Sequence, residues 1–492
     1  MTNPPASDQS SPASPGRIIP LVLAVALFME QMDSTVIATS LPAIAADIGT
    51  SPISLKLALT SYLVALAIFI PISGWMADRF GARRVFATAI GVFVVGSILC
   101  AVASSLMAFV GARFLQGMGG ALMTPVARLV LVRSTAKSDL VGAMAWLTIP
   151  ALVGPLVGPP IGGFITTYAS WHWIFLINVP IGLIGMWLAL TRLPKTPPGE
   201  TPPLDVVGLI LSGAAASGIV FGLSVVSLPA LPPVVGVVTI TVGVVCAVAY
   251  LVHARRAEHP VLALSLMRNQ IFRVSLVGGS IFRIGIGAVP FLLPLMLQLG
   301  FGFTPFQSGM MTFVAALGAM GMKLSTTWIF RRFGFRPVLI FGSLVTAGSI
   351  AIMGLFTPST PVWLMMFIIF AGGFVRSMFF TGVNAFSYAE ISARDTSKAT
   401  PILSVAQQLS IAVGVALAGL ILEVQSSIHG GGLTLTDFHV AFYIIAAVSA
   451  LAAFAFWRLP TDAGSNMSGH VPMARSTTPI NPPKPDQIAS GK

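Results

Sequence analysis

Five charged side chains lie inside long apolar stretches of this chain, and they are the residues best placed to do chemistry. Two are acids three positions apart, Glu30 and Asp33, and three are arginines, Arg113, Arg283 and Arg376. A charge at mid-membrane costs roughly 3 kcal/mol even on lenient insertion scales, so such residues are expected to be functional. The alternative is an ion-pair network that only holds helices together.

A pair of carboxylates beside an arginine is suited to binding and releasing a proton. Glu30 and Asp33 would share one face of a helix, where mutual repulsion favours protonation of one acid and a guanidinium opposes it. We therefore predict that Asp33, with Glu30 as second candidate, carries a proton, and that Arg113 tunes its proton affinity. Gln116, one turn from Arg113, could orient this pair or a substrate, or could only bond a neighbouring helix.

The two remaining arginines have no evident acid near them in the second half of the chain, since Glu423 falls close to the outer end of its stretch. Two acids against three arginines leave the set with a formal charge of +1. Guanidinium groups bind carboxylates through paired hydrogen bonds. This charge favours an organic anion, a carboxylate or a metal–carboxylate chelate, bound by Arg283 and Arg376, with Asn384 as a further contact.

The composition places these residues in a membrane. Of the 492 residues, 55% are hydrophobic and 9% charged, against roughly 25% charged in soluble domains. About fourteen apolar stretches each approach the ~20 helical residues that cross ~30 Å of hydrocarbon. Their centres lie near Leu27, Leu66, Phe93, Met118, Leu152, Gly182, Ala215, Gly243, Ile286, Ala316, Val345, Ile369, Val413 and Ala447. We expect an all-α integral membrane protein with about 14 transmembrane helices.

The basic residues indicate the orientation of these helices. They gather in alternate loops, and Lys56 is the clear exception. Because cytoplasmic loops carry the excess of lysine and arginine, both termini are expected in the cytoplasm. The net charge of +12 therefore reports membrane orientation and contact with the lipid bilayer, and we expect no nucleic-acid partner.

Four stretches together carry a resemblance to a known family. They are MDSTVIATSLP (Met32–Pro42), GWMADRFGARR (Gly74–Arg84), RFLQGMGGA (Arg113–Ala121) and IPALVGPLVGPPIGGF (Ile149–Phe164). As a set they resemble the fourteen-helix drug:proton antiporters of the major facilitator superfamily, the EmrB/QacA type, and MdtD-type members most of all.

The resemblance implies two six-helix bundles with an inserted helix pair, and a cavity lined by the spans that carry the five charges. It implies export of small amphipathic compounds by alternating access, driven by a proton gradient without a cofactor or metal. Such a protein is not an enzyme, and we expect a monomer in a bacterial inner membrane. An accessory periplasmic adaptor remains open as a partner. Proton-symport uptake and a membrane sensor without transport are the weaker alternatives.

An internal repeat supports the division into bundles, because TWIFRRFGFRP (Thr327–Pro337) aligns with GWMADRFGARR. The predicted parts are listed here in chain order: a disordered tail 1–16, an N-terminal bundle 17–193, an inserted pair with its loops 194–272, a C-terminal bundle 273–458 and a disordered cytoplasmic tail 459–492.

Two motifs are expected to control movement. In the basic loop, Gly74 and Gly81 would allow tight packing. Asp78 can accept hydrogen bonds and is a candidate latch that holds the inner side closed. The alternative is that the loop only signals membrane orientation. The predicted gating set is Gly74, Asp78, Arg79, Gly81, Arg83 and Arg84.

In the fifth span, prolines would bend the helix and glycines would admit a close neighbour. That set is Gly154, Pro155, Gly158, Pro159, Gly162 and Gly163. The resemblance associates it with export, and the alternative is a merely kinked packing helix.

Overall fold

The fold is built from membrane-spanning helices. The computed structural model describes residues 18–135, 139–195, 199, 201–226, 228, 231–392, 395–460, 463, 464 and 467, so the predicted tail 1–16 lies outside the described residues. Within them every regular element is a helix. In the described part of the chain, thirteen helices are long and apolar enough to span a membrane, or fourteen if the bent α13 (Pro305–Phe333) counts as one span. The predicted all-α membrane fold is confirmed.

The first half of the chain supplies six spans, of which the second is continued by η2 (Ile70–Ile72) and α4 (Ser73–Phe80). The spans are α1 (Ile18–Val36), α3 (Lys56–Phe69), α5 (Ala82–Ala101), α6 (Leu106–Ser134), α7 (Leu140–Tyr168) and α9 (Asn178–Arg192). The short elements η1 (Ile37–Thr39), α2 (Leu41–Asp47) and α8 (Trp173–Leu176) connect them at one end. We call this end the outer end, following the orientation predicted from the basic residues.

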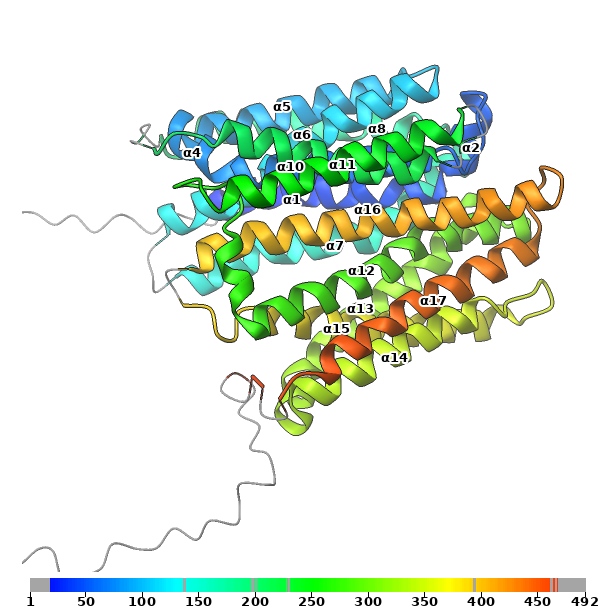
Figure 1. Ribbon diagram of the computed structural model, residues 1–492. Coiled ribbons are helices and arrows are strands. Elements are labelled where there is room, and N and C mark those ends of the chain that lie inside the picture. Colours follow the sequence, from blue (N-terminus) through cyan, green and yellow to red (C-terminus); the bar gives the residue numbers. More distant parts are fainter. Residues whose placement is uncertain are drawn as a thin grey trace, which may run out of the picture.

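The second half repeats the arrangement after the short η3 (Leu264–Arg268). Its spans are α12 (Gln270–Leu295) with its π-helical extension η4 (Met296–Gly300), α13, α14 (Phe335–Met353), α15 (Val362–Phe386), α16 (Thr396–Ile428) and α17 (Leu435–Trp457). Figure 1 shows the two halves one above the other, with α16 running along the line where they meet.

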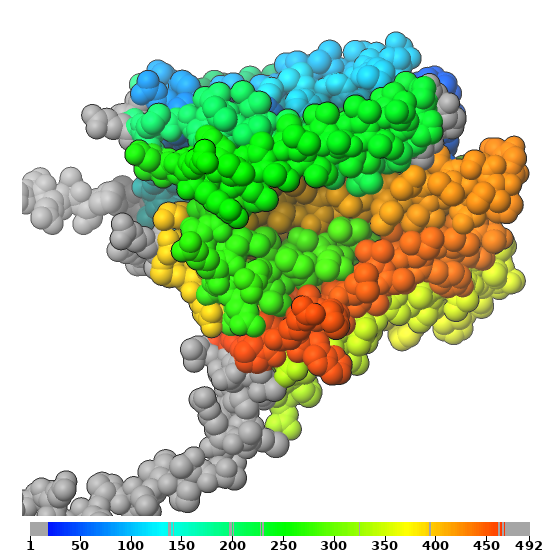
Figure 2. All heavy atoms as spheres, in the orientation of Figure 1, coloured from blue at the N-terminus to red at the C-terminus, as the bar shows by residue number. Residues whose placement is uncertain are grey.

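A helix pair between the halves, α10 (Val206–Val225) and α11 (Pro233–Ala254), covers one side of this line. α10 packs on both α3 and α16, and side chains of the pair (green) form the upper part of the face seen in Figure 2. Glycines hold the pair together, because a methyl group on Gly218 would lie 2.7 Å from the Cα of Gly243. The pair therefore closes a lateral face of the molecule rather than forming a separate unit.

The inner end of this pair is fixed by Asp205, which caps α10. Its carboxylate accepts hydrogen bonds from the backbone N–H of Gly208 at 2.8 Å and of Val261 at 3.4 Å, and pairs with His253 of α11 at 2.7 Å. Partial burial works to raise the pKa of Asp205, but these hydrogen bonds outweigh it and lower the pKa below its ordinary value. Asp205 thus ties both inserted helices to the linker that leads into the second half.

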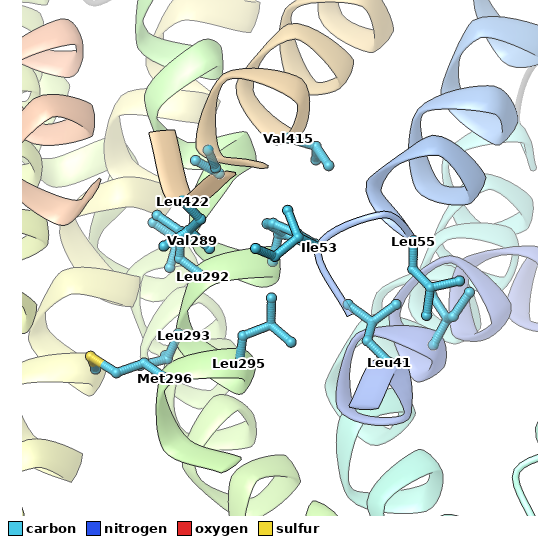
Figure 3. Close-up of a cluster of buried hydrophobic side chains, with 14 of the residues drawn as sticks. Leu41, Ile53, Leu55, Val289, Leu292, Leu293, Leu295, Met296, Val415 and Leu422 are labelled. Atoms are coloured by element: carbon cyan, nitrogen blue, oxygen red, sulfur yellow. The ribbon is translucent and has the colours of Figure 1, made fainter. Parts of the chain in front are cut away.

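The two halves are joined at the outer end by one apolar cluster. It contains Leu41 and Leu55 from the first half and Leu292, Met296 and Leu422 from the second, all fully buried (Figure 3). Hydrogen bonds across the join run from Gln298 Nε2 to the Thr39 carbonyl at 3.0 Å and from the Phe306 N–H to Thr167 Oγ1 at 3.1 Å. Towards the inner end each half has an apolar cluster of its own. This conformation is closed at its outer end.

The glycines of α7 bring three helices into close contact. On the side facing α1, a methyl group on Gly158 would lie 2.1 Å from Thr35 Oγ1, and one on Gly162 would lie 2.4 Å from the Val36 carbonyl. On the side facing α13, a methyl group on Gly163 would lie 2.4 Å from the Pro305 carbonyl. The predicted close approach is confirmed. α7 remains one helix through its four internal prolines.

The ordered chain extends beyond α17. Leu459 and Ala463 are buried in the inner cluster of the second half, and Gly464 lies against the rings of Phe335 and Phe386. The packed part therefore extends past residue 459, where the disordered tail was predicted to begin, because these residues pack against the inner ends of α14 and α15. Residues 468–492 lie outside the described residues.

We predict that Gly162→Ala lowers the unfolding temperature of the purified protein, because the new methyl group meets α1 backbone that cannot turn aside. Overpacking of this kind costs about 1–3 kcal/mol. Gly142→Ala on the same helix is the control, since nothing lies within 4 Å of its Cβ position. Thermal unfolding in detergent, followed by circular dichroism, checks this, and equal unfolding temperatures for the two variants would contradict it.

Candidate functional site

The Asp33 carboxylate lies at the centre of a buried polar cluster. Oδ2 accepts a hydrogen bond from Arg113 Nη1 at 2.7 Å, and Oδ1 accepts from Gln116 Nε2 at 2.9 Å and Asn178 Nδ2 at 2.7 Å. Both charged side chains are at most 1% exposed. Gln116 also donates to Ser97 Oγ at 2.8 Å. Four helices, α1, α5, α6 and α9, thus hold one ion pair.

Aromatic rings cover the cationic side of this cluster. The Arg113 guanidinium lies 4.5 Å from the centre of the Tyr62 ring and 5.7 Å from that of Phe175, distances at which a ring face attracts a cation. Arg113 Nη1 also contacts Gln116 Oε1. The guanidinium is therefore stabilised by Asp33, an amide and two rings in a setting without bulk water.

Glycines of the RFLQGMGGA stretch allow α6 to come this close to its neighbours. A methyl group on Gly117 would lie 2.6 Å from the Tyr62 carbonyl of α3, and one on Gly119 would lie 2.6 Å from the Phe93 nitrogen of α5. At Gly120 it would meet the Tyr62 hydroxyl at 3.0 Å and Glu30 Cγ at 3.5 Å. The glycines thus let the backbone of α6, which carries Arg113 and Gln116, pack directly against α3 and α5.

Glu30 occupies a separate position one turn nearer the inner end of α1. Its carboxylate accepts a hydrogen bond from Thr124 Oγ1 of α6 at 2.8 Å and a long one from Gln31 Nε2 at 3.5 Å. It forms no ion pair within the described part of the chain. The predicted trio is therefore split: Asp33 and Arg113 are in contact, with Gln116 bridging them, and Glu30 stands beside them.

The second half carries a polar contact of a different kind. Arg283 of α12 is 1% exposed, donates to Asn384 Oδ1 of α15 at 2.6 Å, and lies 5.3 Å from the Phe380 ring. Arg376 is eight residues from Asn384 on the same helix, about 12 Å along its axis, and is not part of this contact. Among the described residues no carboxylate pairs with either arginine.

The basic loop is organised around Asp78, whose carboxylate pairs with Arg133 of α6 at 2.7 Å. Both residues belong to the first half, so in this conformation the pair ties α4 to α6 and does not bridge the halves. Its role as a latch stays a prediction. Trp75 Nε1 donates to the Pro202 carbonyl at 2.9 Å, which seats the linker to the inserted pair on this loop.

The remaining members of the gating set differ in what they contribute. Gly81 has φ of 88°, a left-handed conformation that permits the turn between α4 and α5. Gly74 has nothing within 4 Å of its Cβ position, so its predicted tight packing is wrong. Arg83 donates to the Leu190 and Leu193 carbonyls at the end of α9, whereas Arg79 and Arg84 are exposed.

Sequence reasoning missed several members of these sites. Asn178 is a lone amide in an apolar stretch, and a polar side chain there needs a partner, so it could have been singled out. Ser97, Tyr62 and Thr124 gave no such signal, since hydroxyls in spans commonly bond to their own helix. Lys56 and Glu423 were each noted as irregular, yet their mutual contact was not predicted.

We predict that Arg113→Met strongly destabilises the protein, because it leaves Asp33 buried and unpaired, at a cost of about 3–5 kcal/mol. The double variant Asp33→Asn/Arg113→Met should recover part of that loss, and Arg128→Met, exposed on the same helix, should change little. Denaturant titration of the purified protein measures all three. A double variant no more stable than Arg113→Met would refute the pairing as the source of the effect.

Comparison with solved structures agrees with this architecture. The chain is similar to the POT family transporter PepTSo, with a TM-score of 0.66 at 17% identity over 91% of this chain and 98% of the other. It is also similar to a D-xylose–proton symporter, with a TM-score of 0.65 at 16% identity over 91% and 98%. At such identities the likeness shows a shared fold, that of two-bundle membrane transporters.

Sequence comparison narrows the relationship. The model of the Major Facilitator Superfamily matches residues 23–325 and 275–482. Proteins that carry the name multidrug resistance protein MdtD are 37% identical in Escherichia coli O7:K1 (strain IAI39 / ExPEC) and 36% identical in Escherichia coli (strain K12). Each match covers 452 residues, 91% of this chain and 95% of the relative. The chain therefore belongs to the Major Facilitator Superfamily and is a multi-pass membrane transporter, not an enzyme.

Proposed function

We propose that this transporter exports small amphipathic compounds in exchange for protons, by alternating access across a bacterial inner membrane. The observation that carries the proposal is the presence of two carboxylates on α1 in unlike surroundings, one locked to an arginine and one not. The name of its MdtD relatives supports export of drug-like substrates. The distribution of basic residues supports a cytoplasmic position for both termini.

The two acids are assigned different tasks. Both oxygens of the Asp33 carboxylate are engaged, because they accept hydrogen bonds from Arg113, Gln116 and Asn178. Glu30 is bonded mainly to a hydroxyl, that of Thr124, and a hydroxyl can donate to a carboxylate or accept from a carboxylic acid. Protonation of Glu30 thus leaves no arginine without its carboxylate, whereas protonation of Asp33 would deprive Arg113 of its partner. We therefore assign the transported proton to Glu30, and Asp33 holds Arg113 in place.

A cycle follows from this arrangement. A proton that enters from the outside neutralises Glu30 and favours return of the carrier, and its release to the inside accompanies uptake of substrate from the cytoplasm. Moving one charge through 100 mV is worth roughly 2.3 kcal/mol, or about fifty-fold in concentration. One proton per substrate is therefore enough to maintain a useful gradient.

We predict that Glu30→Gln abolishes substrate-induced proton movement in proteoliposomes while the protein unfolds near its normal temperature. Asp33→Asn should lose both transport and stability, because Arg113 is left without its partner. Glu258→Gln, an exposed loop acid, is the control and should retain both. Proton movement is followed with a pH-sensitive dye inside the vesicles. Full proton-coupled transport by Asp33→Asn would sink the proposal, and full coupling by Glu30→Gln would reverse the assignment of the two acids.

A second candidate substrate class is an organic anion, a carboxylate or its metal chelate. It is favoured by Arg283, which is buried against a neutral amide and a ring, and by Arg376, which has no carboxylate partner among the described residues. A buried guanidinium without an acid is costly unless an anion completes it. A cavity selective for lipophilic cations would not be expected to hold two such arginines.

We predict that, if anions are the substrates, small polycarboxylates with or without iron release protons from vesicles and a panel of lipophilic cations does not. Arg283→Gln should then reduce the response at least tenfold, whereas Arg273→Gln, exposed near the start of the same helix, should not. Proton release with the cation panel alone would instead establish export of lipophilic cations and assign Arg283 a role in helix packing.

A further inference from the structure

A second buried ion pair joins the two halves at the outer end. Lys56 Nζ of α3 contacts Glu423 Oε2 of α16, and the two side chains are 0% and 7% exposed. The residues are 367 positions apart and belong to different halves. No other ion pair in the described part of the chain connects the halves.

The position of Lys56 in the fold is unfavourable for a cation, and the contact with Glu423 offsets this. It is the first residue of α3, where the helix dipole repels a cation. It is fully buried, and it lies at the end of the molecule where the loops otherwise hold almost no basic residues. A lysine in such a place requires a specific partner, and that partner is Glu423.

The facing helix is shaped to admit the lysine side chain. A methyl group on Gly419, one turn before Glu423 on α16, would lie 2.3 Å from Lys56 Cδ and 3.3 Å from its Nζ. The stem of Lys56 therefore rests directly on the backbone of α16. Glycine at this position is needed for the contact, not for helix conformation, since no special φ is involved.

The pair stands within the apolar cluster that closes the outer end. Its sequence neighbours Leu55, Leu57, Ala418 and Leu422 are all buried in that cluster. Separating two charges in such surroundings is strongly unfavourable, whereas charges that reach water together are well solvated. The contact therefore has two stable arrangements, paired when the halves meet and hydrated when they part.

We propose that Lys56 and Glu423 form a lock that holds the outer end closed and breaks each time the carrier opens outward. The inference rests on the alternating access proposed above, and it assigns to these residues a conformational task separate from the proton site on α1. The lock acts on the population of the two conformations, whatever the transported compound is.

Electron paramagnetic resonance distances across the outer end test the lock. Spin labels are placed at Ser104→Cys, in the exposed loop between α5 and α6, and at Ser359→Cys, in the exposed loop between α14 and α15. Cys246 is replaced by alanine and the buried Cys100 is retained. The full chain is measured in lipid nanodiscs without substrate or a proton gradient.

We predict that Glu423→Gln and Lys56→Met each raise the fraction of molecules with the longer, outward-open distance at least tenfold. The exchanged pair Lys56→Glu/Glu423→Lys should return the fraction towards that of the unmodified chain. Gly419→Ala should raise it as well, because the methyl group displaces the Lys56 stem while both charges remain. Glu258→Gln is the control and should leave the distances unchanged.

An unchanged distance distribution in folded Glu423→Gln and Gly419→Ala would overturn the lock. If the exchanged pair does not fold, Gly419→Ala alone decides, since it alters no charge. Because no transport is measured, the outcome is independent of the proton proposal. A chain that opens on loss of the lock but moves no protons would refute proton exchange and leave the lock intact.

Discussion

The contact between Arg113 and Asp33 is the interaction on which the first half depends. In a buried ion pair, the remaining donors and acceptors of both side chains need hydrogen-bond partners in the protein. Without them the free-energy cost of removing the two charges from water exceeds their mutual attraction. The surrounding structure meets part of that demand with an amide from α9, an amide from α6 and two aromatic rings, although Arg113 Nε is buried without a hydrogen-bond partner. The glycines of α6 follow from the same requirement, because only a helix with so little side-chain bulk can approach α3 and α5 closely enough.

The helix that carries both acids is also the helix in closest contact with α7. Glycines place α7 backbone directly against α1, and Gly163 and Gly309 bring α7 and α13 together across the two halves. Close-packed backbones cannot absorb a displacement through side-chain rearrangement. A change in the hydrogen bonds of Asp33 or Glu30 therefore has a short route from α1 through α7 to the second half.

Much of this could be read from the sequence, and the rest could not for identifiable reasons. Each predicted span centre falls in a long helix, because a bilayer fixes the length and polarity of what crosses it. Asp33, Arg113 and Gln116 were expected together since charges in spans seek one another. Periodicity alone could not separate Glu30 from Asp33, because what distinguishes them is a hydroxyl on another helix, Thr124.

Contacts between distant residues were harder to foresee. The sequence shows that Lys56 breaks the charge pattern and that Glu423 lies near the outer end of its span, but no local spacing relates positions on α3 and α16. Gly74 was misjudged for the opposite reason, since its motif suggested packing where the structure has open space. In both cases the outcome depends on which helices lie next to each other in the fold, and residue type alone does not reveal that.

The separation of Lys56 from Glu423 also has a consequence for biosynthesis. A ribosome adding about 5–20 residues per second needs roughly 20 to 70 seconds to make the 367 residues between them. In the proposed orientation, Lys56 reaches the outer side of the membrane within that interval, before the acid that neutralises it has been made. The nascent first half must therefore wait, with one charge at the lipid boundary, until α16 arrives to complete it.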